Sequence, residues 1–379
     1  MRNALSPFLY FRRNLSRTLP MTFVIMLAVV LVASVVSVVH SIDLTVYTLY
    51  GYNRYLTGLT PRNALSIDAS EIAKVRRLPE LGELCPAHSY QTLIKTIFGK
   101  MPFPIFGLEA PGRKRILERC GLKLVAGRMP EEAKPEAVLS DDIARNMGLK
   151  IGDIISHPES EDSYAPVPIR LVGLLHGPVW LALTSKAQVD STSPFSFTGY
   201  LAFAPTPGDA AQRRLDNAID RVVDKGQARV WKFAGLVRET QSALANLYLI
   251  LNLIVGIIVF AIAFVCGLLA NIYFTQRLPE VATLAAIGYS RGQLLRRALG
   301  ETGLLCLLGW LLGVLFTVGL LMAVRAVALA PRGLLLDPVD LRAFALTLPL
   351  PITITLFAVV TIGLRLSTLD PVSIIERRG

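Results

Sequence analysis

The sequence predicts an α-helical membrane protein with four transmembrane helices and an α+β extracytoplasmic domain inserted between the first and second helices. Hydrophobic residues make up 53% of the 379 residues and charged residues only 18%, whereas soluble domains carry about 25% charged residues. Four long runs contain no charged residue, and arginines gather in the short segments beside them. Much of the chain therefore cannot form a water-soluble core.

The four uncharged runs are each long enough to cross a membrane. A helix needs about 20 residues to span roughly 30 Å of hydrocarbon. Helices buried in a soluble protein are the alternative interpretation, but four such runs are too many for a soluble fold of this size. The runs are 19–39, 241–276, 302–324 and 343–364.

The second run is longer than a bilayer requires. Its 36 residues would extend about 54 Å as a single helix. The first part, 241–252, is its more polar end. We therefore expect one continuous helix over 241–276 that combines a stalk outside the membrane with the second span.

The distribution of arginine predicts the orientation. The segments before the first run, after the second run and at the C-terminus hold 11 basic and 3 acidic residues, whereas 42–240 holds 25 basic and 22 acidic residues. Basic segments stay in the cytoplasm, so both termini are expected there and 42–240 outside. The net charge of +11 thus reflects topology and not binding of nucleic acid.

A cleaved signal peptide is the alternative for the first run. The run is longer than the 7–15 apolar residues usual in a signal peptide, and it lacks an A-x-A-like cleavage site.

These observations divide the chain into nine segments. The predicted segments are a cytoplasmic amphipathic segment at 1–18, transmembrane helix 1 at 19–41, the extracytoplasmic α+β domain at 42–240, the stalk and transmembrane helix 2 at 241–276, a cytoplasmic loop at 277–300, transmembrane helix 3 at 301–325, a short extracytoplasmic loop at 326–342, transmembrane helix 4 at 343–365 and a cytoplasmic tail at 366–379.

The segment 42–240 mixes strand and helix patterns. Residues 137–139 and 168–175 are expected as strands, and 209–225 as an amphipathic helix with an apolar stripe. Ser140 is expected to cap the helix that follows the first of these strands, and Gly148 to end it. The proline-rich stretch 101–111 is expected to be a loop.

The cysteines and histidines of this segment give weak signals. Cys85 and Cys120 could form one disulfide on the oxidising side, although nothing in the sequence shows that they approach each other; Cys266 and Cys306 lie in spans as packing residues. Cys85 and His88 provide too few ligands for a zinc site, so no metal is expected.

Catalytic and nucleotide-binding motifs are missing from the sequence. It contains no G-x-S-x-G elbow and no G-x-x-x-x-G-K-[ST] loop. The nearest approach to the second motif has Arg113 in place of the lysine. No cofactor is therefore expected to bind this chain, and it is not expected to be an enzyme.

The loop 277–300 contains helix signals of its own. Pro279 and Glu280 suit a first helical turn, Val281, Leu284 and Ala285 share a face, and Gly288 can close a short helix. We expect this helix to lie parallel to the membrane. A plain connector with positive charge is the alternative that these residues leave open.

A second helix is expected directly after Gly288. Ser290 and Gln293 form an S-x-x-Q capping box that would begin it. Arg297 and Glu301 are four residues apart and can pair where the helix enters the membrane.

The same loop resembles a known family. The pattern R-x-x-E-x-x-x-L-x-A-x-G…E, carried by Arg277, Glu280, Leu284, Ala286, Gly288 and Glu301, is similar to that of the FtsX-like permease domain in the MacB–FtsX class of ABC transporters. The stretches 135–155 and 168–175 resemble the periplasmic core of that family, 11–17 its amphipathic N-terminal helix and 369–375 its C-terminal ending. Ala285 departs from the pattern, because this position is usually basic in the family.

The resemblance implies a coupling site. In the family this loop forms a coupling helix that docks on the ATPase subunit. The residues expected to contact the ATPase are Arg277, Glu280, Val281, Leu284, Ala285, Gly288 and Arg291, and those expected to shape the segment are Pro279, Ser290, Gln293, Arg297 and Glu301.

The resemblance also implies a function and partners. It indicates the permease subunit of an ABC transporter in a bacterial inner (plasma) membrane, with ATP and Mg used by a separate ATPase subunit. The expected partners are that ATPase, a second permease chain in a homo- or heterodimer, and a membrane-fusion or other extracytoplasmic protein. Motion would pass to the outer domain for export or extraction of a lipid, lipoprotein, peptide or drug. Activation of an extracytoplasmic enzyme such as a cell-wall hydrolase is the alternative, and a membrane-anchored enzyme is a third hypothesis.

One glycine pair suggests close helix packing. Gly309 and Gly313 form a G-x-x-x-G match in the third run, which allows two helix backbones to approach. Because isolated matches are weak, glycines that face lipid are the alternative.

Overall fold

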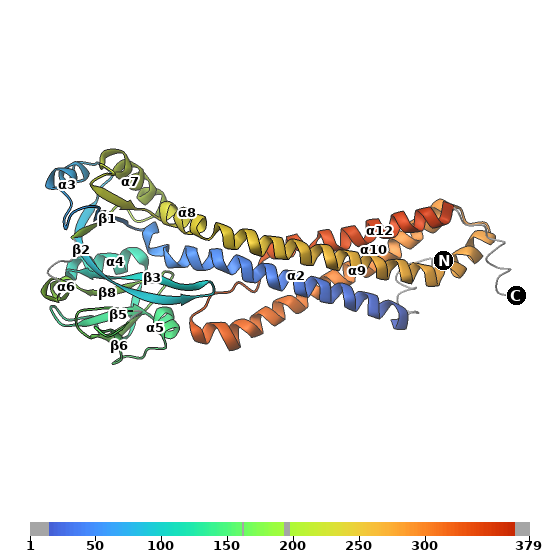
Figure 1. Cartoon of the computed structure of the whole chain (residues 1–379), viewed down its shortest axis with the longest axis horizontal. Helices are drawn as coiled ribbons and strands as arrows, with labels where there is room; N and C mark the ends of the chain where they lie inside the picture. The colour runs from blue at the N-terminus through green and yellow to red at the C-terminus, as the bar shows by residue number, and fades with distance from the viewer. Residues whose placement is uncertain (1–14, 161–162, 193–197, 368–379) are drawn as a thin grey trace. The chain divides into compact units, whose positions relative to one another are not determined.

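The computed structural model describes residues 15–160, 163–192 and 198–367, without some side chains of the helices between 261 and 367. The predicted cytoplasmic segment at 1–18 and tail at 366–379 lie mostly outside the described residues. The chain divides into two compact units, a helical unit (1–40, 246–325 and 336–379) and a sheet unit (41–245 and 326–335). Figure 1 labels their helices and strands.

The helical unit contains long apolar helices. Within the described residues, three helical stretches are long and apolar enough to cross a membrane, namely Thr18–Leu49, Ala245–Leu269 and Gly292–Arg332, and a shorter apolar stretch covers Leu341–Leu356. The helices involved are α2 (Leu15–Leu49), α9 (Ala245–Ala286), α10 (Arg291–Val324), α11 (Leu341–Thr347) and α12 (Pro349–Ser367).

Several predicted boundaries differ from the structure. Helix α2 continues past the predicted end at residue 41 to Leu49, because no helix breaker occurs before Gly51. The predicted helix 343–365 is divided at Leu348 into α11 and α12, since Pro349 is favourable only in a first helical turn. Among the described residues, the fourth predicted span is therefore not a single long helix.

The predicted continuous helix over 241–276 is also wrong at both ends. Helix α8 (Phe233–Ala243) ends at Leu244, whose N–H bonds to the Thr240 carbonyl at 2.9 Å. Helix α9 then begins at Ala245 and runs 42 residues to Ala286.

The separate short helix expected from Pro279 does not form. Helix α9 passes through this position without a break, although a proline inside a helix removes one backbone hydrogen bond and crowds the carbonyl four residues earlier. Good helix formers follow Pro279, so the helix continues through it. The proline resembles the start of a helix but lies inside a longer one.

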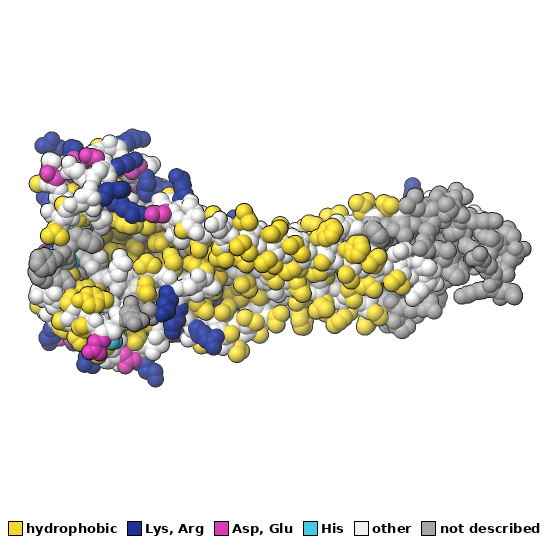
Figure 2. All heavy atoms as spheres, viewed as in Figure 1, with side chains coloured by type: hydrophobic (Ala, Val, Ile, Leu, Met, Phe, Trp, Pro, Cys, Tyr) yellow, Lys and Arg dark blue, Asp and Glu magenta, His cyan; other side chains and the backbone are white. Residues whose placement is uncertain are grey.

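The surface of the helical unit is strongly apolar. Figure 2 shows hydrophobic side chains covering the described helices, whereas charged side chains gather on the sheet unit. On α9, Phe260 is 74% exposed and Leu249 is 66% exposed. Water solvates such a surface poorly, so this unit requires an apolar surrounding.

Helix α10 packs on α2 through its two glycines. A Cβ atom at Gly309 would lie 2.9 Å from Ile25 Cβ, and one at Gly313 would lie 2.7 Å from Val29 Cβ. Both glycines therefore face a helix of the same chain and not lipid. Around this contact, Trp310 donates its indole N–H to Thr347 Oγ1 of α11 at 2.9 Å.

The sheet unit is an α+β domain, as predicted. Its strand order is β10-β1-β9-β2-β3-β8-β5-β7-β4, with β6 paired to β7. The strands are β1 (Thr57–Pro61), β2 (Glu83–Thr96), β3 (Gly99–Leu108), β4 (Lys123–Gly127), β5 (Glu136–Ser140), β6 (Ile154–Ser156), β7 (Ile169–His176), β8 (Ala182–Ser185), β9 (Gly199–Phe203) and β10 (Ala228–Trp231).

Short helices connect these strands. They are η1 (Gly51–Arg54), α3 (Ala69–Arg76), α4 (Ala110–Cys120), α5 (Asp141–Met147), α6 (Lys186–Thr192), α7 (Asp209–Val222), η2 (Arg325–Leu329) and η3 (Ala330–Arg332). The last two lie in the predicted short loop 326–342. That loop joins the sheet unit, because Asn146 Nδ2 donates to the Arg332 carbonyl at 3.1 Å and Leu335 packs on the core.

Several elements expected from sequence in this unit are confirmed, but the capping role of Ser140 is not. Strands β5 and β7 and helix α7 are present, and Gly148 ends α5 in the left-handed conformation at φ 75°. Ser140 occupies the N-cap position of α5, but its hydroxyl makes no capping bond. It accepts a hydrogen bond from the Leu181 N–H at 2.8 Å instead, because β8 offers a backbone partner beside it.

The proline-rich stretch is wrongly predicted as a loop. It forms most of β3 and the first turn of α4. Strand β3 pairs with β2 along its length, but with β8 only over Phe106–Leu108. Pro102 and Pro104 thus lie where the strand has an open edge among the described strands, and an edge needs no N–H donor.

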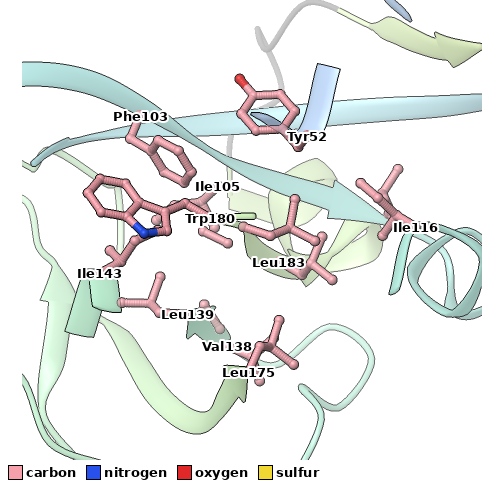
Figure 3. Close-up of a cluster of buried hydrophobic side chains, with 14 of the residues drawn as sticks. Tyr52, Phe103, Ile105, Ile116, Val138, Leu139, Ile143, Leu175, Trp180 and Leu183 are labelled. Carbon is pink, nitrogen blue, oxygen red and sulfur yellow. The ribbon is translucent and has the colours of Figure 1, made fainter. Parts of the chain in front are cut away.

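The main core lies between the sheet and helices α4 and α5. Figure 3 shows Phe103 and Ile105 of β3 close to Trp180, with Leu139, Ile143 and Leu183. Tyr52 meets the Phe103 ring edge-on, with ring centroids 6.0 Å apart. A smaller core under α7 contains Leu215 and Ile219, both fully buried.

A buried polar network joins α7 to β1. Gln212 Nε2 donates to Thr57 Oγ1 at 2.8 Å, and Thr57 Oγ1 donates to the Asp216 carboxylate. Burial raises the pKa of Asp216 to about 6. One turn further on, Asp220 pairs with Lys232 at 2.9 Å, and that bond lowers its pKa.

The two aspartates predict opposite pH effects. Because the folded pKa of Asp216 exceeds the unfolded value, folding binds a proton between about pH 4 and 6, and roughly 2–3 kcal/mol of stability is lost as the pH rises through that window. Asp216→Asn should flatten the dependence of the melting temperature on pH there and raise the melting temperature at pH 7.5. Thermal melts of the purified full chain measure this.

Asp220→Asn is the matched control on the same helix. Its depressed pKa contributes stability above the unfolded pKa that is lost as the pH falls, so this variant should melt lower at pH 7 and approach wild type at low pH. Parallel pH curves for wild type and Asp216→Asn would contradict the assigned burial.

The packing of α10 predicts contrasting effects of two alanine substitutions. Gly313→Ala places a Cβ against Val29 and should destabilise the helical unit by about 1–3 kcal/mol. Gly319, on the same helix, has no atom within 4 Å of its Cβ position. Gly319→Ala should stabilise by about 0.5–1 kcal/mol. Melting temperatures in detergent should move in opposite directions, and equal shifts would contradict the contact.

Candidate functional site

The turn between α9 and α10 is closed first by a glycine. Gly288 has φ of 101°, a left-handed conformation that favours glycine. The Ile287 N–H makes the last α-helical bond here, to the Thr283 carbonyl at 3.2 Å, and the Tyr289 N–H bonds to the Leu284 carbonyl at 3.2 Å. The second of these is the six-to-one bond of the Schellman motif, so Gly288 ends the helix as its position in the sequence predicts.

A capping box then begins α10. The Gln293 N–H donates to Ser290 Oγ at 3.4 Å, and the Ser290 N–H donates to Gln293 Oε1 at 3.0 Å. The predicted capping box is therefore present. The Schellman bond and the capping box thus satisfy some of the backbone groups that the two helix ends leave without helical partners, which favours one defined shape of the turn.

The side chains around this turn form a pocket of about 250 Å³. Leu284, Gln293 and Arg297 were expected from sequence to belong to this segment. Tyr289, Leu294 and Arg296 line it as well and were missed. Tyr289 directly follows the helix-ending glycine, where an apolar contact with Leu284 commonly accompanies the Schellman pattern, and that signal could have identified it.

An ion pair fixes the first turns of α10. Arg297 Nε lies 3.1 Å from Glu301 Oε1, and Glu301 is only 3% exposed. The i to i+4 spacing gives the pair a helical geometry. Arg297 thus lines the turn while it bonds to a buried carboxylate of the same helix, which limits its rotation.

Six of the predicted coupling residues have no described side chains. The backbone places the first five in the last turns of α9 and the sixth at the start of α10, and their roles stay predictions. They are Arg277, Pro279, Glu280, Val281, Ala285 and Arg291.

The two cysteines of the sheet unit are free in the structure. Cys85 Sγ donates to Glu83 Oε1 at 3.3 Å, and Cys120 is buried with 1% exposure. Burial is the main cause that raises the pKa of each thiol to about 12. Both thiols therefore stay protonated near neutral pH. Cys306 is buried against α2, and the side chain of Cys266 is not described.

Metal ligands are not grouped in the described part of the chain. Within residues 15–160, 163–192 and 198–367, no cluster of three or more His, Cys, Asp or Glu side chains could hold a metal ion. His88 instead contacts Asp190 Oδ1 through Nδ1 at 2.5 Å.

Three solved structures match about half of the chain, each with low similarity. The periplasmic region of MacB from Actinobacillus actinomycetemcomitans is 11% identical with a TM-score of 0.30, over 49% of this chain and 92% of that one. The extracellular domain of the noncanonic ABC-type transporter YknZ from Gram-positive bacteria is 10% identical with a TM-score of 0.30, over 47% and 100%. A domain of a putative permease protein from Porphyromonas gingivalis is 13% identical with a TM-score of 0.25, over 48% and 90%.

The comparison with family models gives a match in the helical part of the chain. No curated protein sequence matched. Residues 252–371 match the model of the FtsX-like permease C-terminal domain, a stretch that includes the turn between α9 and α10. The family indicated by the loop pattern is therefore confirmed: this chain carries the C-terminal domain of an FtsX-like permease.

Proposed function

We propose that the chain is the permease subunit of an ABC transporter and that the turn between α9 and α10 couples it to a separate cytoplasmic ATPase. The observation that carries the proposal is the construction of this turn. A Schellman ending and a capping box fix its backbone, and Leu284, Tyr289 and Arg296 surround one pocket. A fixed turn can receive a push from a partner and pass it on without first becoming ordered.

The proposed orientation places this turn in the cytoplasm and the sheet unit outside. The excess of arginine at 277–300 supports this arrangement. It also implies four spans, with α11 and α12 together making the fourth. Both termini would then lie on the cytoplasmic side of a bacterial plasma membrane.

The proposed mechanism is mechanical. The separate ATPase would bind ATP and Mg, and its closure would move the turn. Helix α9, continuous over 42 residues, would extend about 63 Å and supports transfer of that motion toward the outer domain. We propose that this serves export or extraction of a lipid, lipoprotein, peptide or drug, in a dimer of permease chains that an envelope protein such as a membrane-fusion protein can join.

Purification with the ATPase tests the coupling. Tagged full-length chain from its native host should retain an ABC-type ATPase, identified by mass spectrometry, and Glu280→Arg should lose it because the substitution reverses the charge of a predicted contact. Glu239→Arg is the control, since Glu239 is exposed in the sheet unit and pairs with Arg229 at 2.6 Å.

Equal recovery of the ATPase with Glu280→Arg and wild type would refute the coupling assignment. Recovery of an extracytoplasmic hydrolase together with the ATPase, activated by the wild-type chain and not by Glu280→Arg, would favour the regulatory function over transport.

Thiol labelling tests the orientation. Ile287 is 71% exposed beside the turn, and Lys150 is exposed in the sheet unit. In right-side-out membrane vesicles, a membrane-impermeant maleimide should label Lys150→Cys at once and Ile287→Cys only after detergent is added. The wild-type chain is the control, because its described thiols are half-buried or buried. The reverse pattern would overturn the proposed topology.

A further inference from the structure

The sheet unit contains an aromatic pocket that the coupling function does not use. Its volume is about 240 Å³, close to the lower end of the range for small-molecule sites. It is formed by η1, α8 and strands β1, β2, β3, β9 and β10, so it lies entirely within one compact unit. It suits a small molecule or the end of a larger one.

Among the described residues that line the pocket, none is Asp, Glu, Lys or Arg. His88 supplies an imidazole to this lining, and burial lowers the pKa of that ring. Burial also raises the pKa of Tyr52 well above its ordinary value. Both groups are therefore neutral near pH 7, and a charged ligand would lose its hydration without gaining an opposite charge.

The aromatic walls are held in place by contacts with one another and with neighbouring residues. The Trp231 indole donates to Thr60 Oγ1 at 2.7 Å, and the Arg229 guanidinium lies 3.8 Å from the centre of the Trp231 ring. Tyr52 meets the Phe106 ring edge-on, with centroids 5.4 Å apart. Tyr50 Oη accepts a hydrogen bond from Thr240 Oγ1 at 3.1 Å. The walls are thus formed before any ligand arrives.

A buried polar atom of the described lining has no hydrogen-bond partner. Asn53 is 2% exposed, and its Nδ2 donates to the Trp231 carbonyl at 3.1 Å. Its Oδ1 is buried and accepts no hydrogen bond from any described residue. Buried acceptors are nearly always satisfied, so this oxygen is a place for a donor that the described chain does not supply.

We propose that this pocket binds an uncharged, mainly apolar molecule or chain end that donates one N–H or O–H hydrogen bond to Asn53 Oδ1. The aromatic walls would bury its apolar body, and Asn53 would select for the donor. The identification of the bound molecule as the exported cargo rests on the proposed transport function. Binding to the pocket does not depend on that function.

The test uses photolabelling of the full chain in lipid nanodiscs. The probe is octanamide with a diazirine in its alkyl chain, compared with the methyl ester and the free carboxylate of the same chain. Mass spectrometry identifies labelled peptides of the sheet unit, and labelling of the apolar helices reports partition into lipid. The amide should label pocket peptides saturably, with a half-saturation roughly three- to tenfold lower than that of the ester, and the carboxylate should not label them at pH 7.

Two variants address the two parts of the proposal. Asn53→Leu should remove the preference for the amide, so that amide and ester saturate alike. Ser89→Trp should fill the pocket and abolish saturable labelling by both, because Ser89 is a small side chain of its lining. Ala210→Trp, at an exposed position of α7, is the matched control and should behave as wild type. Melting temperatures establish that each variant is folded.

The possible outcomes separate clearly. Persistent saturable labelling in folded Ser89→Trp would refute the site, and a retained amide preference in folded Asn53→Leu would refute the role of Asn53. If Asn53→Leu does not fold, the amide-to-ester ratio of wild type still decides, since equal affinity would refute the donor requirement. Ser89→Trp should still retain the ATPase on purification. Loss of labelling in this variant would then report on the pocket and not on the coupling proposal.

Discussion

An apolar helix surface that water cannot solvate is the constraint on which the helical unit depends. Large side chains such as Phe260, Ile257 and Leu315 project from α9 and α10. In hydrocarbon these side chains cost nothing, but every backbone group must be satisfied within the helix. The hydrophobic effect then gives little help to helix association, so close packing must supply it. The glycines of α10 meet this need, because they let its backbone approach Thr22 and Met26 of α2.

The same requirement shapes the turn after α9. A helix end normally leaves backbone groups without partners, and the Schellman pattern at Gly288 and the capping box at Ser290 satisfy them within a few residues. The turn is thereby short and fixed. A motion applied there is carried by one continuous helix, which is the physical basis of the proposed coupling.

The sheet unit follows the opposite rule, because its surface is charged and its core is packed. Its buried polar groups form defined networks, such as Thr57 with Gln212 and Asp216. Three buried side-chain oxygens of the described sheet unit have no hydrogen-bond partner, on Asn53, Ser156 and Gln188, and of these Asn53 belongs to the lining of the aromatic pocket. An unpartnered acceptor in the lining of an aromatic cavity fits the composition of a binding site.

The sequence by itself determined the apolar helices, the α+β character of the inserted domain, the ending at Gly288 and the capping box, because these depend on local spacing and on residue type. It also carried the family pattern between Arg277 and Glu301. It did not reveal the helix break near Leu244, and it suggested a helix start at Pro279. First-turn signals have the same local form inside a long helix and at its beginning. Strand β3 was missed because the tolerance of its prolines depends on which strands lie beside it. Only the tertiary structure decided that Gly309 and Gly313 face α2, that Ser140 bonds to Leu181, and that Asn53 lies beside Trp231, because each of these contacts joins residues far apart in the chain.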